Sequence, residues 1–258
     1  MHTLLKLKNA RKVVSQLGAA RPGMEVLVLY DLYTGHNVEP LAIAVDEAGA
    51  GLNLLQIAGS ARHGRQLSPV VAQAMQAADL VIALTRANAA HTDARQQATR
   101  AGVGVIVLPE SHQPDFFLAE GWEADFDALR PQIEGLADAL TRADTARVTT
   151  ELGTDVTMSI AGRRGRALHG FANTTDISAG YCLESSLAPV EGTAEGVIVV
   201  NASIPGVSLI RDEPVRIHIE NGMAVAIEGG EVARQFRDLL ASFNAVSYTH
   251  LRAHETKA

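Results

Sequence analysis

Apolar segments alternate with helical segments over the first 145 residues, and this alternation constrains the fold of the chain more than any other feature. The apolar segments carry few polar residues, which is typical of parallel strands that helices cover on both faces. The sequence therefore predicts an α/β fold that begins with a Rossmann-like domain with a parallel sheet. Its strands are expected at residues 24–30, 52–57, 79–84 and 103–108.

Helices are expected before, between and after these strands. The clearest start is at Ser68, because a capping serine is followed by Pro69 at the first helical position. Pro131 is expected to break or kink the last helix, since proline lacks the N–H group that an α-helix bonds. The predicted helices cover residues 4–17, 38–48, 68–78, 91–101 and 120–142.

The pattern changes to short strands and turns after a boundary near Thr145, so that the first domain covers residues 1–145. Asn221-Gly222 joins two alternating segments, residues 215–220 and 223–227, and predicts a tight β-hairpin. The sequence thus predicts a second, β-rich α+β domain over residues 146–245. Further strands are expected within residues 147–160 and 196–204, and a helix from residue 231 to about 243.

The last segment, residues 246–258, differs from everything before it. It resembles the translation of a sequencing adapter, and such segments are excluded from reasoning about a fold. His250 and His254 would lie on one face of a helix beside Glu255, as in a metal site, but the adapter interpretation removes their significance. We expect a non-native tail, so that the chain is the front part of a longer protein and the second domain is incomplete.

The formal charge of −7 argues against nucleic acid or an anionic membrane as a partner. No apolar run approaches the roughly 20 residues of a membrane span, and Lys6 and Lys8 make the N-terminus too polar for a signal peptide. A single cysteine, Cys182, excludes an intrachain disulfide and a cysteine-based zinc site. We therefore expect a cytoplasmic protein whose partner is a small peptide or another small molecule.

Two common kinds of active site have no support in the sequence. The turn after the first predicted strand, residues 30–36, contains no Gly-x-Gly-x-x-Gly, and no Walker sequence occurs in the chain. No Gly-x-Ser-x-Gly elbow occurs either, so that acyl transfer by a serine is not expected. The predicted parallel sheet therefore does not imply a nucleotide.

Two histidines follow predicted strands of the first domain. Ligands of open α/β sheets bind at the carboxyl ends of the strands, so that His91 either faces a crevice there or lies at the surface and caps the next helix. We take His91 as a candidate catalytic residue. His63 lies in an earlier loop of the same edge and is a candidate for substrate binding, with a solvated loop residue as the alternative.

Carboxylates are the candidates for metal binding in the second domain. Glu184 stands five residues before Pro189, where a strand and a turn can hold it as an oxygen ligand for a metal ion; the alternative is a surface carboxylate. Glu191, in the following turn, is a candidate to support that ligand or to stabilise the turn. Arg163 either orients an anionic substrate or pairs with these acids.

Several motifs of the second domain occur together in one group of enzymes. In their order along the chain they resemble the thermophilic-metalloprotease-type aminopeptidases, the aminopeptidase T or leucyl aminopeptidase group. The dihydroxypyridine ring-cleaving dioxygenases share this architecture. The resemblance covers residues 150–243 nearly throughout, and Ala90-His-Thr in the first domain. The motifs are Gly153-Thr-Asp-Val-Thr, Gly162-Arg-Arg-Gly, Glu184-x4-Pro-Val-Glu-Gly-Thr-Ala-x-Gly-Val-Ile-Val-Val, Ile219-Glu-Asn-Gly and Ile227-Glu-Gly-Gly.

The aminopeptidase resemblance implies a hydrolase that removes N-terminal amino acids from peptides with two divalent metal ions, zinc or cobalt. In such enzymes a metal-bound water attacks the first peptide bond. Glu184 matches the first ligand position, although Leu183 stands where the family usually has glycine. The other ligands of the family lie downstream of residue 243. We therefore expect a truncated, metal-poor form of a metallo-aminopeptidase.

Two alternatives stay open beside this expectation. The dioxygenase resemblance implies a single iron ion, held by two histidines and an aspartate from the downstream region, with His91 as an acid or base in the pocket. In that branch the position of Glu184 is not acidic. The other alternative is a catalytically inert module that binds or dimerises. A chain cut after its last helix leaves the apolar face of that helix uncovered, which favours a homodimer.

Overall fold

The computed structural model describes residues 2–60, 64–172, 183–211 and 213–242. Within these residues the chain forms two compact units. The first contains the residues up to Gly135 together with Arg166–Ser185, and the second contains Leu136–Gly165 and the residues from Ser186 onward. The candidate His63 lies outside the described residues, as do Cys182 and the segment 246–258.

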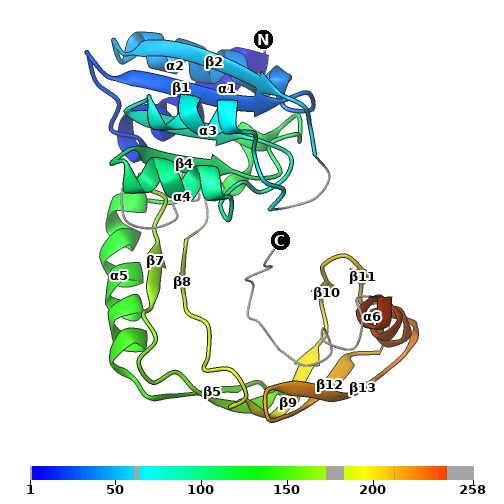
Figure 1. Ribbon diagram of the computed structural model, residues 1–258. Coiled ribbons are helices and arrows are strands. Elements are labelled where there is room, and N and C mark those ends of the chain that lie inside the picture. Colours follow the sequence, from blue (N-terminus) through cyan, green and yellow to red (C-terminus); the bar gives the residue numbers. More distant parts are fainter. Residues whose placement is uncertain (1, 61–63, 173–182, 212, 243–258) are drawn as a thin grey trace. The chain divides into compact units, whose positions relative to one another are not determined.

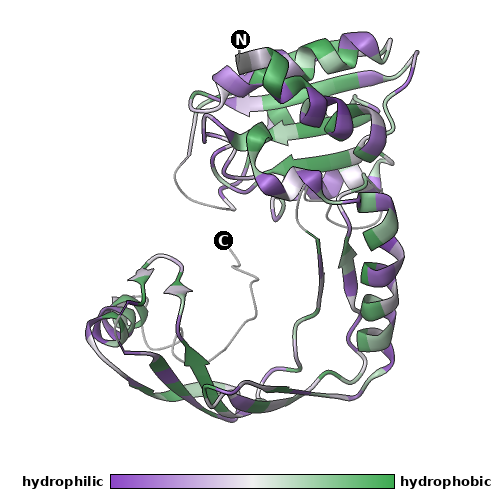
Figure 2. Cartoon of the chain, turned by 180° about the vertical axis from the view of Figure 1, so that it is seen from behind, coloured by the Kyte–Doolittle hydropathy of each residue, from purple (hydrophilic) through white to green (hydrophobic). Residues whose placement is uncertain are grey.

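The first unit contains a four-stranded parallel sheet with the order β2-β1-β3-β4 (Figure 1). β1 covers Glu25–Asp31, β2 Gly51–Ile57, β3 Leu80–Leu84 and β4 Gly104–Leu108. All of β3 is buried, because it has a strand on each side and helices over both faces. Figure 2 shows that these strands are mostly hydrophobic, whereas the helices carry both kinds of residue. The predicted α/β fold with a parallel sheet is therefore confirmed.

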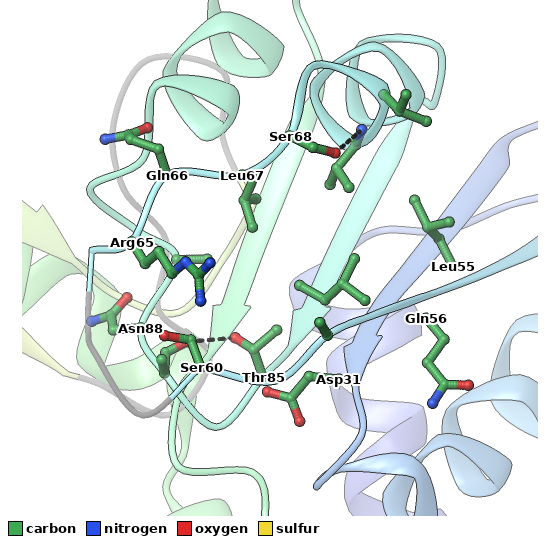
Figure 3. A pocket seen from close by; sticks show the side chains of 16 residues that line it. Asp31, Leu55, Gln56, Ser60, Arg65, Gln66, Leu67, Ser68, Thr85 and Asn88 are labelled. Atoms are coloured by element: carbon green, nitrogen blue, oxygen red, sulfur yellow. Dashed lines mark hydrogen bonds between the residues drawn. The ribbon is translucent and has the colours of Figure 1, made fainter.

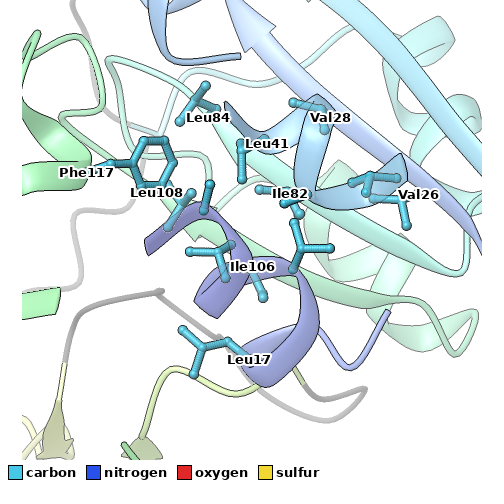
Figure 4. Packing of buried hydrophobic residues seen from close by; sticks show 14 of the residues in the cluster. Leu17, Val26, Val28, Leu41, Ile82, Leu84, Ile106, Leu108 and Phe117 are labelled. Carbon is cyan, nitrogen blue, oxygen red and sulfur yellow. The ribbon is translucent and has the colours of Figure 1, made fainter. Parts of the chain in front are cut away.

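Alternate residues of β1, β3 and β4 pack against different helices. Val26 and Val28 of β1 belong to a buried cluster with residues of the first two helices, part of which is seen in Figure 4. Leu27 and Leu29, which point to the opposite face, pack with residues of the next two helices. The helices are α1 (His2–Arg11), continued by a π-helical segment (Lys12–Leu17), and α2 (Val38–Glu47) on the first face, and α3 (Pro69–Gln76) and α4 (Asp93–Arg100) on the second.

A long helix, α5 (Phe126–Arg142), follows two short 3₁₀ helices, Phe116–Leu118 and Glu120–Glu123. The helix continues through Pro131, so the break that the sequence predicted at this proline does not occur. Trp122 anchors the preceding segment, since it is almost fully buried and its indole Nε1 donates a hydrogen bond of 2.9 Å to the carbonyl oxygen of Phe116.

The segment after residue 165 returns to the first unit. Its strand β7 (Arg166–Leu168) pairs with β8 (Glu184–Ser186) in a two-stranded sheet. The N–H group of Ala172 donates to the carbonyl oxygen of Leu17 at 2.8 Å. Phe171 packs against the same buried cluster as α1 and α2. The first unit is therefore built from two separate stretches of chain.

The second unit contains a five-stranded antiparallel sheet with the order β13-β12-β9-β6-β5. Asn221 and Gly222 both have positive φ angles, 50° and 72°, which a two-residue hairpin of type I′ requires. The predicted hairpin is thus confirmed. The elements are β5 (Thr145–Thr149), β6 (Asp155–Ser159), β9 (Glu195–Val200), β12 (Val215–Glu220), β13 (Met223–Glu228), the short strands β10 (Ser203–Ile204) and β11 (Ser208–Leu209), and α6 (Glu231–Ser242).

None of the helices in the described ranges combines the length and the apolar character that crossing a membrane demands.

Candidate functional site

A pocket of about 550 Å³ lies at the carboxyl ends of β1, β2 and β3 in the first unit (Figure 3). β1 has β2 on one side and β3 on the other, so the chain changes direction across the sheet at this point. Ligands of open α/β sheets bind at such switch points. The residues that line the pocket are Asp31, Leu55, Gln56, Ile57, Ala58, Ser60, Arg65, Gln66, Leu67, Ser68, Val70, Val71, Thr85, Ala87, Asn88 and Ala89.

Asp31, the last residue of β1, joins the loops at the bottom of the pocket. Its side chain is buried, and its carboxylate accepts hydrogen bonds from the backbone N–H of Tyr33 (2.9 Å, to Oδ1) and of Arg86 (2.7 Å, to Oδ2). The nearby Thr34 hydroxyl donates to the carbonyl oxygen of Leu84 at 2.8 Å. These bonds fix the turn after β1 to the turn after β3, so Asp31 holds the floor of the pocket in place.

The side of the pocket formed by β2 and the start of α3 is apolar. Leu55 and Leu67 border the space from opposite sides, and the guanidinium of Arg65 points into it (Figure 3). Ser68 begins α3 as predicted, because its hydroxyl accepts a bond of 3.4 Å from the N–H of Val71. Neither Arg65 nor Asp31 was a predicted site residue. The available signal was their position, since each follows a predicted strand at one edge of the sheet.

His91 lies near this edge but is not among the residues that line the pocket. It is partly buried and sits in the turn directly before α4. The residue that caps α4 is its neighbour Thr92, whose hydroxyl accepts a bond of 3.3 Å from the N–H of Arg95. The structure thus assigns the cap of α4 to Thr92, and the catalytic role of His91 stays a prediction.

Glu184 is exposed at the start of β8, which differs from the expected carboxylate pointing inward. The alternation of side chains along a strand explains the difference. Ser185, the next residue, points the other way and donates a bond of 2.7 Å to the carbonyl oxygen of Ile133 in α5. In the described residues no three His, Cys, Asp or Glu side chains are close enough to hold a metal ion. A ligand role of Glu184 gains no support from this arrangement.

Arg163 and Glu191 form an ion pair with each other in the second unit. Glu191 is exposed and Arg163 is partly buried. Of the two interpretations of Arg163, the structure therefore shows the one in which it pairs with a nearby acid. A surface ion pair of this kind contributes roughly 0–1 kcal/mol to stability, so the pair has a small energetic role.

His169, in the returning segment of the first unit, is a buried histidine that was not a predicted site residue. It is 8% exposed, its Nδ1 accepts a bond of 3.3 Å from the N–H of Phe171, and its Nε2 lies 3.7 Å from Oε1 of Glu134. Burial lowers the pKa of His169, the positive charge of Arg130 lowers it further, and Glu134 opposes both. His169 is therefore held in its neutral form inside the unit.

Five chains of solved structures are similar to this chain, among them the following two. The 2,5-dihydroxypyridine dioxygenase from Pseudomonas putida KT2440 has a TM-score of 0.81 and 19% identity over 98% of this chain and 75% of that chain. AmpT from Thermus thermophilus has a TM-score of 0.60 and 17% identity over 96% of this chain and 77% of that chain. At these identities the likeness shows the shared fold. No curated protein matches the chain.

The family comparison corrects the expected function. A family model described as "NicX: 2,5-dihydroxypyridine 5,6-dioxygenase" matches residues 10–251, which is most of the chain. The similarity to AmpT is the weaker of the two structural matches. The expectation of an aminopeptidase is therefore wrong, and the weight that it gave to an acid at position 184 was misplaced. The shared superfamily is confirmed: the chain belongs to the NicX family, the family of 2,5-dihydroxypyridine 5,6-dioxygenases.

Proposed function

We propose that this protein cleaves the ring of a dihydroxylated pyridine with molecular oxygen. The observation that carries the proposal is the family match, because it extends over residues 10–251 and so includes described residues of both units. The structural likeness to the Pseudomonas putida dioxygenase supports it at the level of the fold. In this reaction both atoms of O₂ enter the organic product and one carbon–carbon bond of the ring breaks.

Iron is the cofactor that we propose for this chemistry, where its role is to activate oxygen towards the ring. The described residues do not provide a site for it, since they contain no group of three side chains that can hold a metal ion. We therefore assign no iron ligand to any described residue, and Glu184 is not proposed as one.

The side chain that we assign to proton transfer is His91. A ring hydroxyl of the substrate must lose a proton as the ring is oxidised, and imidazole exchanges protons near neutral pH. His91 lies beyond the end of β3, at the sheet edge where α/β proteins bind their ligands, and it is only partly buried. These features support a role in which His91 accepts that proton.

Oxygen uptake tests the proposed reaction. Protein loaded with ferrous ion under nitrogen and then mixed with 2,5-dihydroxypyridine and air is expected to consume one O₂ for each ring lost. The same preparation is expected to release no amino acid from short peptides in zinc or cobalt buffer. Loss of the ring without oxygen uptake, or no loss of the ring at all, contradicts the proposal.

Replacement of His91 by glutamine tests its role within this reaction. We expect kcat to fall by roughly 100-fold or more, with a much smaller change in KM, because general acid–base catalysis contributes about that factor. His36→Gln is the matched control, since His36 is an exposed histidine on a short helix after β1. Equal rates for the His91→Gln variant and the unaltered protein rule out His91 as the base.

A further inference from the structure

We propose that the pocket at the carboxyl ends of β1, β2 and β3 is a binding site for a two-ring organic molecule with a single carboxylate. This inference does not depend on ring cleavage, because it uses only residues of the pocket itself. It rests on the size of the pocket, on its charge and on the hydrogen-bond donors that are already occupied.

The size of the pocket favours a molecule larger than one ring. A closed apolar cavity of about 150 Å³ accommodates benzene, and pockets for organic ligands typically measure about 300–1,000 Å³. The volume here is about 550 Å³. A single pyridine ring would leave much of the apolar wall formed by Leu55, Ile57 and Leu67 in contact with water. A two-ring molecule covers more of that wall.

The charge of the pocket favours one negative group. Among the described residues that line the pocket Arg65 is the only cation, and in the described part of the chain it has no hydrogen-bond or ion-pair partner. Asp31, the only acid of this described lining, has both carboxylate oxygens engaged by backbone N–H groups. A ligand with one carboxylate therefore pairs with Arg65, and the described lining offers no second cation for a second negative group.

The occupied donors disfavour a polyphosphate such as that of a dinucleotide. In nucleotide-binding α/β folds, free backbone N–H groups of the turn after the first strand bind phosphate. Here the N–H groups of Tyr33 and Arg86 are bound to Asp31, a negative group that also repels phosphate. At the start of α3, Ser68 occupies the N–H of Val71, and Pro69 has no N–H to offer.

Two further side chains provide polar contacts for the body of the ligand. Thr85 donates its hydroxyl proton to the carbonyl oxygen of Ala87 at 2.7 Å, so that its oxygen is an acceptor towards the pocket. Gln66 uses its amide oxygen to accept the N–H of Asp93 at 2.8 Å, which leaves its NH₂ group as a donor. A ring hydroxyl can donate to Thr85 or accept from Gln66, whereas a ring nitrogen without hydrogen can only accept from Gln66.

Calorimetric titration of the whole chain with 2-naphthoate tests this site. The neutral analogue 2-naphthalenemethanol and the nucleotide ADP serve as comparison ligands, and no iron or pyridine is added. We expect 2-naphthoate to bind with a Kd below 1 mM (on the order of 4 kcal/mol of binding free energy or more). The alcohol and ADP are each expected to bind about 10-fold more weakly, because a charge-assisted hydrogen bond to Arg65 is lost or the phosphates are repelled.

Two variants and one control locate the binding. Arg65→Gln is expected to weaken 2-naphthoate about 10-fold and to leave the alcohol unchanged. Ala87→Trp fills the pocket and is expected to abolish binding of both. Arg100→Gln removes an exposed arginine of α4, outside the pocket lining, and is expected to change nothing.

The proposal is overturned if 2-naphthoate does not bind, if the alcohol or ADP binds as tightly, or if Ala87→Trp binds like the unaltered protein. Should Arg65→Gln fail to fold, the comparison of the three ligands on the unaltered protein still decides the role of the charge. None of these outcomes depends on oxygen uptake, so failure of this site and failure of the proposed reaction are distinguishable.

Discussion

At the scale of single residues, the side chains that organise the sheet edge are buried polar groups with complete hydrogen bonding. Asp31 satisfies two backbone N–H groups that no strand or helix satisfies, and it does so where two loops meet. His169 has a comparable role in the returning segment, where it receives the N–H of Phe171. An unsatisfied buried N–H costs about 1–3 kcal/mol, so these residues matter more for stability than the exposed ion pairs.

Replacement of Asp31 by asparagine is expected to lower the free energy of unfolding by about 1–3 kcal/mol. Asparagine has one acceptor oxygen, and its NH₂ group faces the second backbone N–H, which then has no partner. Urea unfolding measures the effect. Asp46→Asn, at an exposed position of α2, is the matched control with an expected change of less than about 0.5 kcal/mol. Equal stability of the two variants would refute the role of Asp31 in fixing the turn after β1 to the turn after β3.

The lowered pKa of His169 predicts that stability falls when the pH decreases. Between the lowered pKa and the ordinary value of about 6.5, the unfolded chain binds a proton that the folded chain does not bind. Stability is therefore complete above about pH 6.5 and is lost below it, by at most about 1.4 kcal/mol for each pH unit. Urea unfolding at pH 7.5 and 5.5 measures this dependence.

The variant His169→Asn tests the assignment, because its amide oxygen replaces Nδ1 as the acceptor for Phe171 and does not titrate. It is expected to reduce the dependence on pH, whereas His36→Asn, at an exposed position, is expected to retain it. An unchanged dependence in His169→Asn assigns the effect to other groups.

At the scale of elements, the strands and most helices of the first 145 residues could be predicted, because apolar alternation and capping residues act over a few neighbours. β3 was expected at residues 79–84 and covers Leu80–Leu84. The Asn221-Gly222 hairpin was expected for the same local reason. The pairing of β7 with β8 could not be predicted. Each has three residues, too few for a period, and their partners are distant in sequence.

Gly196 lies where β9 and β6 of the second sheet approach each other closely. Its φ angle is 127°, and a Cβ atom there would lie 2.1 Å from the carbonyl oxygen of Asp155 in β6. Gly196→Ala is therefore expected to lower the free energy of unfolding by more than about 2 kcal/mol, since backbone atoms must move. Thermal and urea unfolding measure the loss.

Gly135→Ala is the control with the opposite expectation. Gly135 lies inside α5 with no atom within 4 Å of an added Cβ, so alanine should raise stability by about 0.5–1 kcal/mol through helix propensity. A similar loss in both variants would show that the close contact at Gly196 is not the cause.

At the scale of the whole molecule, the superfamily could be predicted from the motifs, but the branch could not. Glu184 was predicted to be a metal ligand because its neighbours in sequence fit a strand and a turn. The alternation of β8 instead leaves its side chain exposed, with Ser185 facing α5. The comparison over residues 10–251 uses the entire pattern of the chain and selects the dioxygenase branch. A single residue in a local motif was not enough to distinguish the aminopeptidase branch from the dioxygenase branch.

The path of the chain has a consequence for any attempt to dissect this protein. Within the described residues the backbone passes between the units three times, after Gly135, Gly165 and Ser185. A fragment that stops near residue 145 therefore lacks Leu168, Phe171 and Leu183, which cover both faces of the first core. Exchanging one complete unit between homologous genes therefore requires a junction at each of these three positions. A single crossover point would leave each recombinant protein with units whose interiors combine residues of both parents.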